Sequence, residues 1–174
     1  MGAPGRAAAG RIQLRPLAPA DRSELARLLN NKKIWDNLRD IMPHPYSEQD
    51  ADNFIRMTGK ENPRVTFAIE YEGQFCGVIG LIPGADIYRR GAELGYWIGE
   101  PWWGKGIATE AVRQMVAYSF DELGLVRLQS GVMAHNPGSM KVLENNGFVL
   151  EGVFKKAIFK NGLIVDEHRY ARTV

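Results

Sequence analysis

The sequence predicts an α/β domain built on a mixed sheet, and three observations support that class. β-rich runs alternate with amphipathic segments along the 174 residues, which is the pattern of a sheet covered by helices. A glycine-rich turn lies between an apolar strand and an amphipathic helix over residues 94–116. The pair Asn161-Gly162 separates two further β-rich runs and is a strong hairpin signal. The predicted order is β-α-α-β-β-β-α-β-α-β-β, with helices on both faces of the sheet.

The strands follow from residue alternation and from β-branched and aromatic residues. The first run alternates polar and apolar side chains and ends at a proline-rich turn. Glu72-Gly73 joins the second and third runs as a hairpin, as Asn161-Gly162 joins the last two. The predicted strands are residues 11–17, 65–71, 75–82, 91–99, 126–134, 148–159 and 163–170.

The helices follow from apolar stripes and from capping residues. Leu25, Leu28 and Leu29 share one stripe of the first helix. Ser47 caps the second helix and Asn136 caps the last, whereas the prolines within residues 30–46 keep that segment a loop. The predicted helices are residues 21–29, 47–59, the segment from the glycine-rich turn to about residue 123, and 136–146.

The composition is that of one folded domain. Hydrophobic residues make up 45% of the chain, which supports a sizeable core in a chain too short for two ordinary domains. We expect a single domain over residues 11–174, after a disordered tail of small residues at 1–10. The tail lacks the apolar segment of a signal peptide and no stretch could span a membrane, so a cytoplasmic protein is expected.

Charge, histidine and cysteine usage argue against several ligand classes. The 22 basic and 20 acidic residues nearly balance and form no run of one sign, so neither nucleic acid nor a membrane is predicted as a partner. His44, His135 and His168 lack the spacing of a metal site, and no metal is expected. The single cysteine, Cys76, lies in an apolar strand and is expected to be a buried thiol.

The glycine-rich turn, Gly104-Lys105-Gly106, is predicted to bind a phosphate group. The first amides of a helix have no intrahelical partner and carry partial positive charge, and glycine lets an anion approach them closely. The run from Gly99 to Lys105 is nearly a P-loop, but Gly106 stands where that loop needs a hydroxyl. A dinucleotide fingerprint would need another small residue where Thr109 stands. The diphosphate of coenzyme A, bound without metal, is the ligand left.

Two segments closely resemble the GNAT N-acetyltransferases, and within them the RimJ and RimL branch of ribosomal-protein N-terminal acetyltransferases. They are Gly-Tyr-Trp-Ile-Gly with Trp-Trp-Gly-Lys-Gly-Ile-Ala-Thr-Glu-Ala within residues 95–111, and Asn-Pro-Gly-Ser-Met-Lys-Val-Leu-Glu-Asn-Asn-Gly-Phe at residues 136–148. The resemblance extends over residues 11–172. One departure is Pro101, where the superfamily often has Arg or Gln.

The resemblance implies the GNAT fold, acetyl-CoA as co-substrate, and acetyl transfer to a primary amine by direct attack in a ternary complex. It implies that a backbone N–H near Ile98 stabilises the oxyanion. It also implies that Asn136 contacts the pantetheine arm and that the hydroxyl of Ser139 protonates the departing thiolate. The residues expected to bind acetyl-CoA are Trp97, Ile98, Gly99, Gly104, Lys105, Gly106, Ile107, Ala108, Thr109, Asn136 and Ser139.

A base is also needed, because a primary amine is mostly protonated at neutral pH. Glu93 is the candidate, since it shares a strand face with Trp97 and precedes the phosphate turn. It would act directly or through water. The alternatives are that Glu93 lies at a solvated strand end or pairs with Arg89 or Arg90.

The acceptor amine is expected to meet residues 34–46, with Trp35 and Tyr46 as candidates, and also Tyr96, which alternates with Trp97 along its strand. A protein N-terminal α-amine and a small-molecule amine both remain open. The alternative function is a non-catalytic acyl-CoA-binding or sensing domain on the same fold. A monomer and a homodimer joined through the terminal hairpin are both compatible with the sequence.

Overall fold

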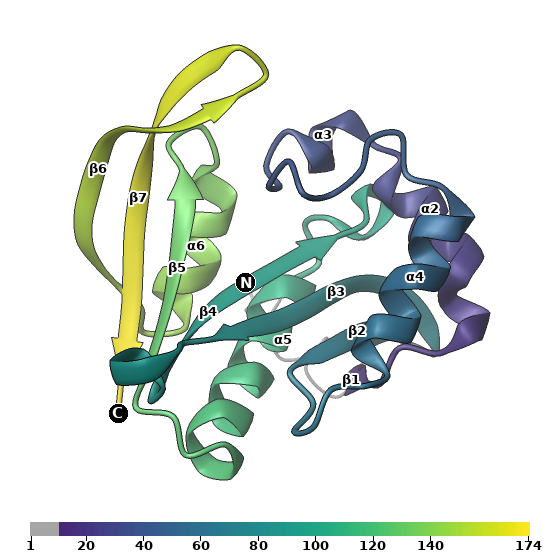
Figure 1. The fold of residues 1–174 in the computed structure, drawn as a ribbon, viewed down its shortest axis with the longest axis horizontal. Helices are drawn as coiled ribbons and strands as arrows, with labels where there is room; N and C mark the ends of the chain where they lie inside the picture. Colours follow the sequence, from purple (N-terminus) through teal and green to yellow (C-terminus); the bar gives the residue numbers. More distant parts are fainter. Residues whose placement is uncertain (1–10) are drawn as a thin grey trace, which may run out of the picture. The chain divides into compact units, whose positions relative to one another are not determined.

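The computed structural model describes residues 11–174 (Figure 1). The tail predicted at residues 1–10 lies outside the described residues. Within the described range the strands are hydrogen bonded in the order β1-β2-β3-β4-β5-β7-β6. Their bounds are β1 Ile12–Arg15, β2 Thr66–Tyr71, β3 Gln74–Pro83, β4 Gly91–Ile98, β5 Arg127–Met133, β6 Val149–Lys160 and β7 Leu163–Thr173. The helices are α2 Arg22–Leu29, α3 Lys32–Trp35, α4 Glu48–Thr58, α5 Ile107–Ala117 and α6 Pro137–Asn145. The predicted mixed α/β architecture is confirmed.

The described residues form two compact units. The first holds the described residues up to Gly80 together with Tyr96–Ala111, and the second holds Leu81–Gly95 and Val112–Val174. Three elements, β3, β4 and α5, each contribute residues to both units. A single domain over residues 11–174 stays a prediction.

In the first unit, β1 pairs antiparallel with β2, and β2 pairs antiparallel with β3. Ser47 and Asp50 form a capping box at the start of α4, because each side chain accepts the backbone N–H of the other residue. The helix start predicted at Ser47 is therefore confirmed. Apolar residues of α2, α4, β2 and β3 share one buried cluster that includes Leu25, Leu28, Leu29, Ala51, Ile55, Ala68, Phe75 and Val78.

In the second unit, β4 pairs in parallel with β5, and β7 pairs antiparallel with both β5 and β6. The helix α6 lies beside β5 and β7 (Figure 1). Two contacts attach it to β7: the Tyr170 hydroxyl donates to the Glu144 carboxylate at 3.0 Å, and Arg172 donates to the Asn146 carbonyl at 2.6 Å. Residues of β5 alternate between the two faces of the sheet, and the more exposed face carries Arg127 and Gln129.

One local difference from the predicted elements has a physical cause. The predicted loop at residues 30–46 contains α3, whose first turn is capped by the Asn31 side chain accepting from the Lys33 N–H at 3.0 Å. Four residues are too few to show a helical apolar period, so the neighbouring prolines dominate the sequence signal. The predicted helix to about residue 123 is confirmed in its extent, since α5 continues directly into a π-helix over Tyr118–Glu122.

The terminal hairpin is confirmed together with its turn. Asn161 and Gly162 connect β6 to β7 with φ values of 54° and 75°. Positive φ at both central residues is what a type I′ turn requires, and this turn matches the twist of antiparallel strands.

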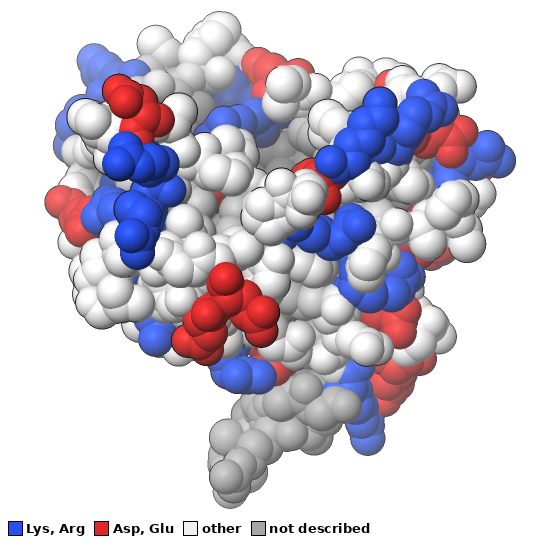
Figure 2. Space-filling view, turned by 60° about the horizontal axis from the view of Figure 1, so that its bottom comes forward, with Lys and Arg blue, Asp and Glu red and all other residues white. Residues whose placement is uncertain are grey.

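Charged side chains of both signs are interspersed over the face drawn in Figure 2, and neither sign covers it alone. Several are paired, among them Arg11 with Glu72 and Arg127 with Glu151, each at 2.6 Å. Residues 11–174 include no helix that is both long and apolar enough to cross a membrane.

Candidate active site

The predicted phosphate turn is open above its two glycines. Gly104 and Gly106 have φ values of 75° and 74°, and a Cβ built on either would meet no atom of the described residues within 4 Å, its chain neighbours aside. α5 begins at Ile107, directly after the turn. Helix-start amides beside open space form a site that suits a phosphate.

Two tryptophans anchor this turn. The Trp103 indole N–H donates to the Ile98 carbonyl at 2.7 Å. The Trp102 ring packs edge-on against Tyr71 with 5.9 Å between centroids, and the exposed Lys105 ammonium lies 5.3 Å from the Trp102 ring. The Trp102 indole N–H is buried without a hydrogen-bond partner among the described residues. Trp102 therefore packs beside the turn, whereas Trp103 is 46% exposed and is held by its hydrogen bond. One buried donor beside the turn, the Trp102 N–H, is left unsatisfied by the described part of the chain.

The residues at the end of β4, just before the phosphate turn, are closely packed. Trp97, Ile98 and Gly99 are buried, and the Gly99 N–H donates to the Cys76 carbonyl at 2.8 Å. A Cβ built on Gly77 would stand 2.2 Å from the Trp97 carbonyl oxygen, so only glycine fits there. Tyr96 is less buried than Trp97.

Cys76 is a buried thiol, as predicted. Its Sγ–H donates to the Ile69 carbonyl at 3.2 Å. Burial, with a smaller contribution from the charge of Glu70, raises the pKa of Cys76 to about 12. Since the thiolate is the nucleophilic form, this residue is a poor candidate for a covalent acyl-enzyme.

The start of α6 carries the two residues that the resemblance assigns to the pantetheine end of the ligand. Asn136 is the helix cap, with its Oδ1 accepting from the Ser139 N–H at 3.3 Å, and Pro137 occupies the first helical position. Ser139 is partly exposed. Capping therefore accounts for the Asn136 side chain without any ligand.

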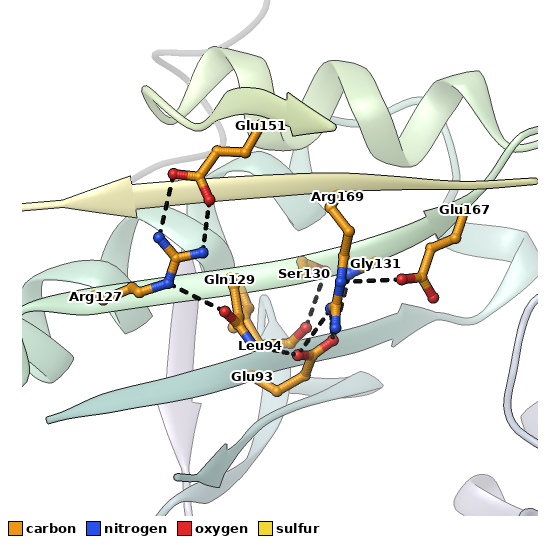
Figure 3. A network of polar contacts seen from close by, with 9 residues as sticks. All are labelled: Glu93, Leu94, Arg127, Gln129, Ser130, Gly131, Glu151, Glu167 and Arg169. Carbon is orange, nitrogen blue, oxygen red and sulfur yellow. Dashed lines mark hydrogen bonds and ion pairs between the residues drawn. The ribbon is translucent and has the colours of Figure 1, made fainter. Parts of the chain in front are cut away.

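Glu93 lies in a hydrogen-bonded network of β4, β5 and β7 (Figure 3). Its Oε1 accepts from Arg169 Nη1 at 3.0 Å and from the Gly131 N–H at 3.3 Å. Its Oε2 accepts from the same Arg169 nitrogen at 3.1 Å and from the Gln129 amide at 3.2 Å. The Arg169 Nε also contacts Glu167 at 3.0 Å. Glu93 is thus held in place rather than free at a solvated strand end.

The arginines that the sequence offered as partners of Glu93 make other contacts. Arg89 donates to the Asp86 carbonyl and Arg90 donates to the Gly124 carbonyl. Arg169 was not predicted as a partner, because 76 residues separate it from Glu93 in the sequence. The one available signal was that Arg169 alternates with buried Tyr170 in a predicted strand, which places it on the face opposite the core.

Residues 34–46, the segment expected to meet the acceptor, are held in place by contacts within the segment. The Trp35 indole N–H donates to the Met42 carbonyl at 3.2 Å, and the ring stacks on His44 with 4.8 Å between centroids. Asn37 Oδ1 is buried and has no hydrogen-bond partner within residues 11–174.

Tyr46 belongs to the buried cluster of the first unit and is 3% exposed. Its backbone exchanges two hydrogen bonds with the Asn30 side chain. Burial, and secondarily the charge of Asp50, raises the pKa of Tyr46 to about 12. Its surroundings are those of a core residue.

These features fit the diphosphate of coenzyme A. The open glycines and the start of α5 supply backbone donors, and the exposed Lys105 ammonium is the cation of the turn. No group of three His, Cys, Asp or Glu side chains in the described part of the chain could hold a metal ion.

Comparison with known proteins identifies the family. The family model for the acetyltransferase (GNAT) domain matches residues 11–149. Among curated relatives, the chain is 49% identical to the Probable N-acetyltransferase YjcK of Bacillus subtilis, covering 89% of this chain and 90% of that protein. It is 28% identical to the ribosomal-protein-serine acetyltransferase of Escherichia coli, covering 94% of this chain and 93% of that one.

A solved structure agrees with these relatives. The spermidine N-acetyltransferase of Vibrio cholerae, in complex with CoA and spermine, superposes with a TM-score of 0.80. It is 26% identical, and the match covers 94% of this chain and 96% of that one. The phosphate turn, the family model and these relatives agree, and the chain belongs to the GNAT family of N-acetyltransferases.

Proposed function

We propose that residues 11–174 act as one domain that transfers the acetyl group of acetyl-CoA to a primary amine by direct attack. The observation that carries this proposal is the phosphate turn, in which two positive-φ glycines leave open space at the start of α5. The bound CoA in the related Vibrio cholerae structure supports the same co-substrate. A cytoplasmic location belongs to the proposal too, supported by the ribosomal-protein relative.

The turn would bind the diphosphate through the backbone N–H groups around Gly104, Gly106 and Ile107, with Ala108 and Thr109 completing the first turn of the helix. The backbone near Ile98 would stabilise the oxyanion formed on the thioester carbonyl. Trp97 and Gly99 would hold that backbone in position, because both are buried. Asn136 would contact the pantetheine arm in addition to capping α6.

The chemical step requires two proton transfers. The amine nitrogen attacks the thioester carbonyl carbon, the carbon–sulfur bond breaks, and the coenzyme leaves as a thiolate. Glu93 would accept the amine proton directly or through water, and the Ser139 hydroxyl would give a proton to the thiolate sulfur. The buried Cys76 thiol takes no part in this route.

The acceptor would be either a protein N-terminal α-amine or a small-molecule amine. The first is supported by the ribosomal-protein-serine acetyltransferase and the second by the spermidine enzyme. Trp35, Tyr46 and Tyr96 are the proposed acceptor residues, and of these Tyr46 is buried.

The test is a panel of acceptors assayed for release of the coenzyme thiol. Peptides that begin with Ser, Ala or Met are compared with spermidine and with an amino sugar. Glu93→Gln should bind acetyl-CoA as the wild type does, while kcat falls by about 100-fold or more, as for loss of a general base. Unchanged turnover would remove Glu93 as the base. Acetyl-CoA binding with no transfer to any member of the panel would contradict the proposed acceptor class.

A further inference from the structure

One nitrogen of Arg169 contacts both oxygens of Glu93. Nη1 lies 3.0 Å from Oε1 and 3.1 Å from Oε2. The two side chains are 28% and 19% exposed, so solvent screens this pair less than it screens an ordinary surface ion pair. A cation that contacts both oxygens restricts rotation of the carboxylate about its last bond.

Arg169 is in turn held by groups other than Glu93. Its Nε contacts Glu167 Oε1 at 3.0 Å, and its guanidinium lies 5.6 Å from the ring of Phe154 on β6. Figure 3 shows Arg169 reaching down from β7 between Glu93 and Glu167. Because Glu167 and Phe154 also contact the guanidinium, its position does not depend on Glu93 alone.

Gly131 makes room for this arrangement. A Cβ built on Gly131 would lie 2.7 Å from Glu167 Cδ and 2.8 Å from its Oε2. The Glu167 carboxylate therefore occupies the space that a side chain on β5 would take. The Gly131 N–H also donates to Glu93, so one glycine serves both carboxylates.

We propose that Arg169 is a positioning residue that holds the Glu93 carboxylate in the orientation needed for proton transfer. This inference rests on the proposed role of Glu93 as the base. Lysine is not an equivalent substitute, since a single ammonium lacks the second nitrogen that reaches Glu167. The arrangement predicts that the catalytic effects of Glu93 and Arg169 are not independent.

The experiment is a double-mutant cycle on kcat with Glu93→Gln, Arg169→Gln and the combined variant. Glu93→Gln should lower kcat by about 100-fold or more, and Arg169→Gln by about 10- to 100-fold through misplacement of the carboxylate. The double variant should be no slower than Glu93→Gln alone, because a displaced carboxylate and an absent one lose the same function. Arg169→Lys should recover part of the kcat.

Acetyl-CoA affinity and melting temperature are measured for every variant. Lys155→Gln is the matched control, since it removes a cation whose ion pair with Asp166 bridges β6 and β7 without touching Glu93. It should keep the wild-type kcat. Should Arg169→Gln fail to fold, the same cycle is run with Arg169→Lys.

The outcomes separate the two proposals. If the losses in kcat multiply in the double variant, the positioning role of Arg169 is wrong while the role of Glu93 stands. If Glu93→Gln keeps the wild-type kcat, the base assignment fails and the Arg169 inference fails with it. An unchanged kcat in Arg169→Gln overturns the Arg169 inference alone.

Discussion

Gly77→Ala should damage catalysis although Gly77 is not one of the proposed acetyl-CoA-binding residues. The new Cβ would lie 2.2 Å from the Trp97 carbonyl oxygen and 3.1 Å from the Ile98 Cα, whereas ordinary contacts begin at 3.4 Å. The backbone at Trp97 and Ile98 must therefore move by about 1 Å. A misplacement of that size near reacting groups costs about 100-fold in rate. The forced repacking should lower stability by about 1–3 kcal/mol.

The assay compares kcat and melting temperature of Gly77→Ala with those of Gly73→Ala. Gly73 lies in the β2–β3 turn with φ of 80° and no described atom near its built Cβ beyond its chain neighbours. Its replacement should cost about 1–2 kcal/mol of backbone strain and leave kcat unchanged. A Gly77→Ala protein with wild-type kcat would refute the link between this contact and the oxyanion backbone. A wild-type melting temperature as well would refute the packing argument itself.

Two further predictions concern the phosphate turn and the acid stability of the first unit. Gly106→Ala should weaken acetyl-CoA binding by about 10-fold or more in calorimetry, because a methyl group enters the open space at φ 74°. The control is Gly124→Ala, which changes another positive-φ glycine with open space and should leave acetyl-CoA binding unchanged. Burial acts to raise the pKa of Asp21, but hydrogen bonds from Arg15 and from the Ala18 N–H outweigh it and hold the pKa below its ordinary value. The resulting stabilisation is present above about pH 4 and is lost as pH falls through the lowered pKa. The melting-temperature gap between wild type and Asp21→Asn should therefore shrink below pH 4, and a constant gap would contradict this assignment.

Local signals predicted the parts of the fold that depend on neighbouring residues. The capping box at Ser47, the cap at Asn136 and the turn at Asn161-Gly162 each act within a few residues. The helix and hairpin boundaries that they set could therefore be predicted from the sequence. The single-turn helix α3 was not, since its cap at Asn31 resembles any loop asparagine.

The contacts of the candidate site depend on strand register, which a single sequence does not reveal. Glu93 lies opposite Gln129 only because β4 and β5 pair in parallel in that register. Arg169 lies opposite Gly131 through the β5–β7 pairing. A shift of one residue would send these side chains to the other face. The phosphate turn could be predicted without knowing the strand register, because its glycines and the helix that follows are contiguous in the sequence.

Because the Cys76 thiol is buried, its reaction with a disulfide reagent can report whether the protein is folded. A folded chain with no accessible sulfhydryl gives no background with a disulfide reagent, so colour development counts only coenzyme released during turnover. Once the fold opens, the same cysteine becomes reactive and adds one equivalent per chain. A single reagent can thus separate a variant that has lost chemistry from one that has lost structure.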